Sequence, residues 1–171
     1  NRPVHHFSAA EIEAVPMPEL AFDASQVAQD DFEKYFYFHR PDTTFDVAFL
    51  DITECDALTS GLTFYGGASQ AMINQQIFQY GMAGAIGGAI GSVLADAIFG
   101  SGERRKQRRI NMRNCMYYKG YDRYGLEKDL WQEFNFEEGN SREEAESRAQ
   151  KLMMQARVAS GPKPEQEALQ P

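Results

Sequence analysis

Two cysteines are the residues of this sequence most suited to act together chemically. Cys55 and Cys115 are the only cysteines in the chain, and each falls on the apolar face of a segment that we expect to be helical. A disulfide between them would close a loop of about sixty residues and stabilise the fold by about 4 kcal/mol in the chain-entropy model. The alternative is a pair of buried free thiols. The matched helical faces favour the disulfide.

Other reactive side chains do not form a catalytic or metal-binding pattern. The sequence has three histidines, His5, His6 and His39. Together with the two cysteines, they do not have the spacing of a structural zinc site. The adjacent acidic pairs at 30–31, 137–138 and 143–144 carry side chains that diverge on a helix or strand, so we expect surface charge there. The glycine pair in YGGASQ is not followed by the Lys-Ser/Thr of a phosphate-binding loop. We therefore expect no enzymatic activity, no metal and no cofactor.

Composition indicates a folded domain that does not bind nucleic acid. The 171 residues are 43% hydrophobic and 12% aromatic, with a net charge of −8. Binding to nucleic acid needs a basic face for the phosphates. One basic cluster is present, and we expect it to be a solvated helix face. Its members are Arg104, Arg105, Lys106, Arg108 and Arg109.

The first residue and the cysteines favour an exported protein. The sequence begins at Asn1 rather than Met, so we expect that an upstream segment such as a signal peptide has been removed. Two cysteines in such a chain favour an oxidising compartment. A mature lipoprotein begins with Cys, and this sequence does not, which disfavours a lipid anchor at residue 1.

The elements that must position these residues fall into three parts. Residues 1–31 contain three prolines and no sustained apolar period, which predicts an extended arm that wraps a partner or the domain itself. Residues 32–136 form a predicted helical core. Residues 137–171 form a helix and a loose tail, and the helix is predicted to start at Ser141 with Glu144 completing a capping box.

Three helices are expected in the core, giving a mainly α fold: a helical hairpin or small bundle around a glycine-rich central helix. The first begins after Thr44 as N-cap and ends before Gly61, with Phe45, Phe49, Ile52 and Cys55 on one face. A strand is the alternative for this segment. The second spans about 68–99, and the third follows a Gly-Ser-Gly break at 100–102 and ends at Gly120.

Glycines in the central segment indicate close helix packing. Gly84, Gly87, Gly88 and Gly91 make two overlapping GxxxG spacings, which expose a flat stripe of backbone to another helix. Only sixteen uncharged residues, 80–95, are available for a membrane span, short of the roughly 20 that a bilayer needs. A flexible linker would not carry so many branched apolar residues. The pattern favours a packing helix over either alternative.

Aromatic residues are expected to bind a partner. Four are consecutive, Tyr35, Phe36, Tyr37 and Phe38, and Trp131 lies in a second aromatic segment with Phe134 and Phe136. The consecutive aromatics form a short strand or pack as an anchor. Such residues are enriched at the centres of interfaces, and a chain of this length has limited core to cover them. The alternative is that the two aromatic clusters pack on each other within the domain.

A short run around the second cysteine gives the chain a resemblance to a known group. Cys115, Met116, Lys119, Gly120 and Tyr121 form a Cys-Met-x-x-Lys-Gly-Tyr run. With this run, residues 38–135 resemble small glycine-zipper-containing proteins exported to the cell envelope of Gram-negative bacteria, in which the second cysteine lies in a Cys-Met-x-x-(Lys/Arg)-Gly-Tyr run. The resemblance implies a periplasmic or outer-membrane location and a structural role.

These observations together predict a non-catalytic structural or accessory subunit of a cell-envelope assembly. Its partners would be other envelope proteins, further copies of itself, or both, contacted through the arm, the aromatic clusters and the small-residue helix, with contact to a membrane and none to nucleic acid. The alternative is a membrane-inserting oligomer built from glycine-zipper helices.

Gly88→Val tests the predicted helix contact. Valine adds side-chain volume where two backbones meet, and overpacking of this kind costs about 1–3 kcal/mol. We expect a lower melting temperature or a smaller assembly on size-exclusion chromatography. An unchanged melting temperature and elution volume would place the glycine stripe against solvent or lipid.

Overall fold

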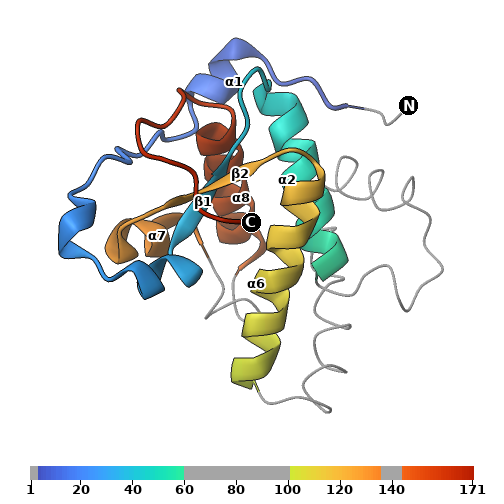
Figure 1. Ribbon diagram of the computed structural model, residues 1–171. Coiled ribbons are helices and arrows are strands. Elements are labelled where there is room, and N and C mark those ends of the chain that lie inside the picture. Colours follow the sequence, from blue (N-terminus) through green and yellow to red (C-terminus); the bar gives the residue numbers. More distant parts are fainter. Residues whose placement is uncertain (1–3, 60–100, 136–143) are drawn as a thin grey trace.

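A computed structural model describes residues 4–59, 101–135 and 144–171 (Figure 1). The described part is mainly helical, as the sequence predicts, with five α-helices and one two-stranded sheet. The predicted helix over 68–99, with its glycines at 84, 87, 88 and 91, lies outside the described residues, and so does Ser141.

Helix α2, Phe45–Thr59, confirms the helical prediction for this segment and excludes the strand. Thr44 caps it as expected, because its Oγ1 accepts a hydrogen bond from the backbone N–H of Val47 at 3.3 Å. Side chains around most of its circumference are buried. This burial follows from its place in the fold, because α6 and α8 both pack against it and the N-terminal arm covers its first turns.

Helix α6, Ser101–Tyr118, runs antiparallel to α2 and extends past its end (Figure 1). It begins within the predicted Gly-Ser-Gly break, so Gly102 is helical. It ends as predicted at Gly120, whose φ of 88° is the left-handed conformation that glycine favours. The N–H of Gly120 donates to Tyr117 O and that of Tyr121 to Met116 O, which is the Schellman pattern. This turn sends the chain back toward the core.

Strands β1, Phe36–His39, and β2, Asp122–Gly125, form an antiparallel pair. The aromatic run is therefore a short strand, one of the two forms expected for it. Phe36 pairs with Gly125 and His39 with Asp122. Because β2 follows directly after the turn at Gly120, the end of α6 determines where the second strand lies.

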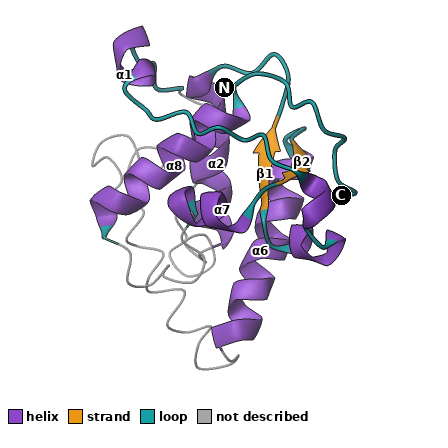
Figure 2. Ribbon diagram, turned by 90° about the vertical axis from the view of Figure 1, so that its left-hand side faces the viewer, coloured by secondary structure: helices purple, strands orange, loops and turns teal. Residues whose placement is uncertain are grey.

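Helices α7, Lys128–Phe134, and α8, Ala145–Ala159, complete the core (Figure 2). Helix α8 packs against α2, β1 and α7, and so borders two apolar clusters. One cluster joins α2, α6 and α8 around Ile52, Cys55 and Leu152. The other joins the sheet, α7 and α8 around Trp131 and Val158.

The N-terminal arm packs on its own domain over the residues that the structure describes. It is not extended throughout, because it contains helix α1, Ala9–Glu13, and two 3₁₀ turns, η1 at Ala24–Gln26 and η2 at Gln29–Glu33. Phe7 contacts the rings of Phe45 and Phe49 edge-to-face at 5.1 and 5.2 Å. Over this segment, the arm therefore wraps the domain itself, which is one of the two alternatives expected from the sequence.

The C-terminal region differs from the sequence prediction in two respects. Helix α8 has Glu144 as its N-cap, with no side-chain cap hydrogen bond, so the predicted capping box is wrong. The tail after α8 is also held in place: Leu169 N donates to Arg123 O at 2.7 Å, and Arg123 Nη2 donates to Gln170 O at 2.6 Å. Arg123 is buried and needs acceptors, which the tail provides.

Gly125→Ala tests the packing of η2 on the sheet. A Cβ atom at Gly125 would lie 2.8 Å from two ring atoms of Phe32, so we expect a loss of about 1–3 kcal/mol in the free energy of unfolding. Gly102→Ala is the matched control, since a Cβ there meets nothing within 4 Å and alanine favours the helix. Urea denaturation measures both, and equal stability of the two variants would contradict the contact.

Candidate functional site

The disulfide between Cys55 and Cys115 is present and joins α2 to α6. The two sulfur atoms lie 2.01 Å apart and the Cα atoms 5.7 Å apart, within the usual range of a disulfide. This confirms the predicted pairing and excludes two free thiols. The bond lies inside the cluster shared by α2, α6 and α8, so it cross-links two helices that are separated in the chain by residues 60–100.

A buried ion cluster lies beside the disulfide. Lys119 Nζ is 3.1 Å from Asp51 Oδ1 and 2.8 Å from Glu54 Oε2. The carboxylate side chains are 10% and 4% exposed and the lysine side chain is 14% exposed, so solvent screens the pairs only weakly. The cluster binds the end of α6 to the middle of α2 one helical turn from the disulfide.

Tyr121 and Arg40 complete this cluster from outside the two helices. Tyr121 donates a hydrogen bond from its hydroxyl to Asp51 Oδ2 at 2.9 Å. Burial and then the charge of Asp51 raise the pKa of Tyr121 well above the ordinary value. The guanidinium of Arg40 lies 4.6 Å from the centroid of the Tyr121 ring, and its Nη1 donates to Lys119 O at 2.6 Å.

These contacts give each residue of the Cys-Met-x-x-Lys-Gly-Tyr run a structural role. Cys115 forms the disulfide, Met116 is fully buried, and Lys119 pairs with two acids. Gly120 permits the turn, and Tyr121 bonds to Asp51. Because the charged groups are engaged with one another inside the protein, the cluster is suited to fixing two helices together.

Sequence reasoning missed the acids of this cluster and Arg40. Asp51 lies four residues before Cys55 and Glu54 directly before it, so both flank the disulfide on α2. Lys119 follows Cys115 by four residues, one turn along α6. Opposite charges flanking the two cysteines at helical spacing are a signal that could have identified the pair. Arg40 gives no such signal, because it lies in a loop after β1.

The aromatic residues expected to bind a partner are covered by the chain itself. Phe36, Tyr37 and Trp131 are at most 8% exposed. The Tyr35 ring lies edge-to-face on Trp131 at 5.2 Å, and Tyr37 stacks on Tyr124 at 5.6 Å. For these residues, the two aromatic clusters therefore pack on each other within the domain, which was the alternative expected from the sequence. Phe38 is half-buried against the α2–α6–α8 cluster, and Phe136 lies outside the described residues.

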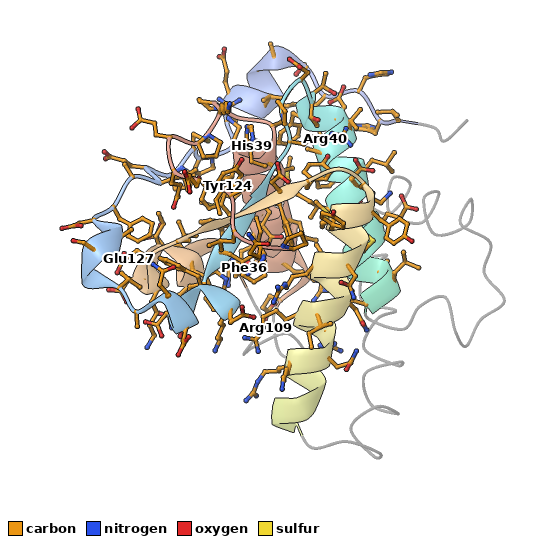
Figure 3. All side chains as sticks on the ribbon, viewed as in Figure 1. Phe36, His39, Arg40, Arg109, Tyr124 and Glu127 are labelled. Carbon is orange, nitrogen blue, oxygen red and sulfur yellow. A yellow bond between two sulfur atoms is a disulfide. The ribbon has the colours of Figure 1, made fainter. Side chains whose placement is uncertain are left out.

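A pocket of about 120 Å³ opens between β1, α2, α6, α7 and α8. Apolar residues make most of its wall: Phe36, Phe38, Ile52, Met112, Trp131 and Phe134. The cations Lys34, Arg108 and Arg109 and the acid Asp56 also line it. In Figure 3, Arg109 of α6 lies just below Phe36 of β1. Sequence reasoning did not identify this pocket, because its residues come from five separate elements.

The basic cluster of α6 is only partly solvated. Lys106 is exposed, as expected for a solvated helix face, whereas Arg105, Arg108 and Arg109 are half-buried. Further along the helix, Arg113 pairs with Glu33 at 2.8 Å and lowers the pKa of that carboxyl. The expectation of a solvated face therefore fails for the arginines that line the pocket. The side chain of Arg104 lies outside the described part.

No cluster of histidine, cysteine, aspartate and glutamate suited to a metal ion occurs within residues 4–59, 101–135 and 144–171. Over the same residues, none of the helices has the length and apolar character to cross a membrane.

Comparison of the chain with models of protein families, with characterised proteins and with solved structures found no match.

Tyr121→Phe tests the ion cluster. The variant keeps the ring but removes the donor to Asp51, so we expect a loss of about 1–2 kcal/mol in the free energy of unfolding at pH 7. Tyr118→Phe is the control, because the Tyr118 side chain is 93% exposed. Guanidinium denaturation should leave the control within about 0.5 kcal/mol of the wild type.

The same pair of variants has an expected pH dependence. The raised pKa of Tyr121 means that the folded protein holds the phenolic proton more tightly than the unfolded chain does. The contribution of Tyr121 to stability is therefore fully present below pH 10.0, the ordinary pKa of tyrosine, and is lost as the pH rises above that value. We expect stability above pH 10 to fall more steeply in the wild type and in Tyr118→Phe than in Tyr121→Phe. Parallel curves would contradict the assignment.

Proposed function

We propose that this protein is a non-catalytic structural subunit of a cell-envelope assembly, in which the described domain is a rigid base that holds residues 60–100 by both ends. The observation that carries the proposal is the double connection between α2 and α6. The disulfide and the Lys119 ion cluster join the helix that leads into residues 60–100 to the helix that leads out of them.

Joining those two helices has a clear physical consequence. A segment of 41 residues whose ends are free to separate gives up loop-closure entropy each time it forms a defined contact. When its ends are cross-linked in the folded base, that entropy is already lost. Contacts made by residues 60–100 with a partner or with another copy then carry a smaller conformational cost.

In this role, residues 60–100 make the partner contacts, and the aromatic residues do not. Phe36, Tyr37 and Trp131 are buried in the base, and Tyr35 is half-buried against Trp131, which leaves these residues little surface for a partner. The predicted small-residue stripe at Gly84, Gly87, Gly88 and Gly91 is then the main contact surface, because exposed glycine lets two backbones approach closely.

An oxidising envelope compartment suits this base. The disulfide lies in the core that α2, α6 and α8 share, and such a bond forms and persists outside the reducing cytosol. The resemblance of residues 38–135 to exported glycine-zipper proteins points the same way. Membrane insertion by several glycine-rich segments side by side is the second candidate, because GxxxG spacings let neighbouring helices pack closely within a bilayer.

Size-exclusion chromatography with light scattering on natively extracted protein tests the proposal. We expect an oligomer or a complex with another envelope protein, and Gly88→Val should lower its mass while Gly102→Ala, in the base, should leave it unchanged. A stable monomer without co-purifying protein would contradict a structural subunit. Extraction by high salt or carbonate indicates a peripheral subunit, whereas a need for detergent would favour the membrane-inserting alternative.

A further inference from the structure

We propose that residues 162–171, the tail that follows α8, exchange between two copies of this chain, so that each tail binds β2 of the other copy in a symmetric dimer. The binding site for the tail, here called the tail site, is the outer edge of β2 together with the adjoining end of α6. Residues 60–100 take no part in this exchange, so the inference goes beyond the proposed function.

The outer edge of β2 needs hydrogen-bond donors from another segment. Strand β2 pairs with β1 along one edge, and the carbonyl oxygens of Arg123 and Gly125 accept hydrogen bonds along the other edge, because alternate residues of a strand direct their carbonyls to the same side. Leu169 N donates to Arg123 O at 2.7 Å, and Gln166 Nε2 donates to Gly125 O at 3.0 Å. The buried guanidinium of Arg123 also donates to Gln170 O at 2.6 Å. Leaving these groups without partners is costly, so the tail site requires an occupant.

Most of the tail lies in solvent. Pro164, Gln166 and Leu169 are half-buried, and the other residues of the tail are exposed. Leu169 packs incompletely, because a gap of about 40 Å³ is lined by Leu169 and by Tyr117 of α6. In Figure 1 the tail, drawn in red, loops away from α8 and returns to β2. A segment with so little buried surface opens at a lower free-energy cost than the core does, so the tail detaches while the rest of the domain stays folded.

The connection between α8 and the tail is short and stiff. Pro162 and Pro164 fix their own φ angles and bias Gly161 and Lys163 toward extended backbone. The closed chain nevertheless bends at Gly161 and Pro162 to return the tail to β2. A short connection of this kind reaches a second copy by straightening, which is the condition that favours exchange of a segment between copies.

The occupant best suited to the tail site is the tail of a second copy. It brings the same hydrogen-bond groups to β2, so the closed chain and the exchanged dimer differ mainly in the cost of association. Two exposed apolar side chains lie near the two ends of the tail: Met17 is 40% exposed and neighbours Gly161, and Tyr117 is 55% exposed and lines the gap at Leu169. A second copy that covers them offsets the cost of association, and such contacts form in the dimer and not in the closed chain.

Cross-linking between isotope-labelled copies tests the exchange. Full-length protein in which photo-leucine partly replaces leucine is prepared in unlabelled and heavy-nitrogen forms, and the two forms are mixed at high concentration and separated by size-exclusion chromatography. We expect a dimer in which photo-leucine at position 169 cross-links to the peptides that contain Tyr117 or Arg123. These links should join a light chain to a heavy chain as often as random pairing of copies predicts, whereas links in the monomer fraction should lie within one isotope.

Two pairs of variants separate the connection from the tail site. Insertion of Gly-Ser-Gly between Gly161 and Pro162 lets the tail return to its own β2 without the bend, so the dimer fraction should fall several-fold, whereas the same insertion after Pro171 should leave it unchanged. Gln166→Ala removes a hydrogen bond that the closed chain and the dimer share, so the dimer fraction should stay the same while light–heavy links form roughly fivefold faster, the factor for one neutral hydrogen bond. Glu167→Ala, at an exposed position, is the matched control and should form these links at the wild-type rate.

Three results would overturn the proposal. A protein that stays monomeric at every concentration would show that the tail keeps to its own chain. A dimer whose tail cross-links all lie within one isotope would show that the copies meet elsewhere. Equal dimer fractions for the two insertions would show that the connection does not control the exchange.

Gly88→Val keeps this test distinct from that of the proposed function. It should lower assembly through residues 60–100 and leave the light–heavy tail links unchanged, and loss of those links in this variant would contradict exchange through the tail alone. Circular dichroism identifies a variant that fails to fold, and the comparison of Gln166→Ala with Glu167→Ala then decides.

Discussion

The connection between α2 and α6 is the interaction on which the rest of this structure depends. The disulfide fixes the two helices at one point, and the pairing of Lys119 with Asp51 and Glu54 fixes them at a second point one turn away. Two points of attachment set the direction of α6 as well as its distance from α2. Removing one partner of such a buried ion cluster costs about 3–5 kcal/mol, because charge is left unpaired in the interior.

The sheet follows from that connection. Once α6 is fixed, the turn at Gly120 places Tyr121 in the core and starts β2 beside β1. Strand β2 then buries Arg123, whose guanidinium lies 4.8 Å from the centroid of the Phe36 ring and donates to Phe32 O and Gln170 O. A buried guanidinium requires acceptors, and here segments near both ends of the chain provide them. Burial lowers the pKa of Arg123, in keeping with this dry environment.

The sequence by itself determined the elements whose signals are local. Thr44 marked the start of α2 and Gly120 the end of α6, because a cap and a left-handed turn depend on neighbouring residues only. The cysteine pairing followed from two apolar helical faces. The start of α8 was misplaced, because a capping-box pattern can occur in the sequence without forming the cap.

Contacts between distant segments were decided only by the tertiary structure. The sequence left open whether the aromatic residues covered one another or a partner, since nothing local records that Tyr35 meets Trp131 or that Tyr37 meets Tyr124. The tail looked loose because residues at a chain end are poorly ordered unless another segment ties them down, yet a buried arginine on β2 holds it. The ion cluster and the pocket likewise combine residues from several elements. Such groups are stabilised by burial and charge pairing, which exist only once the chain has folded.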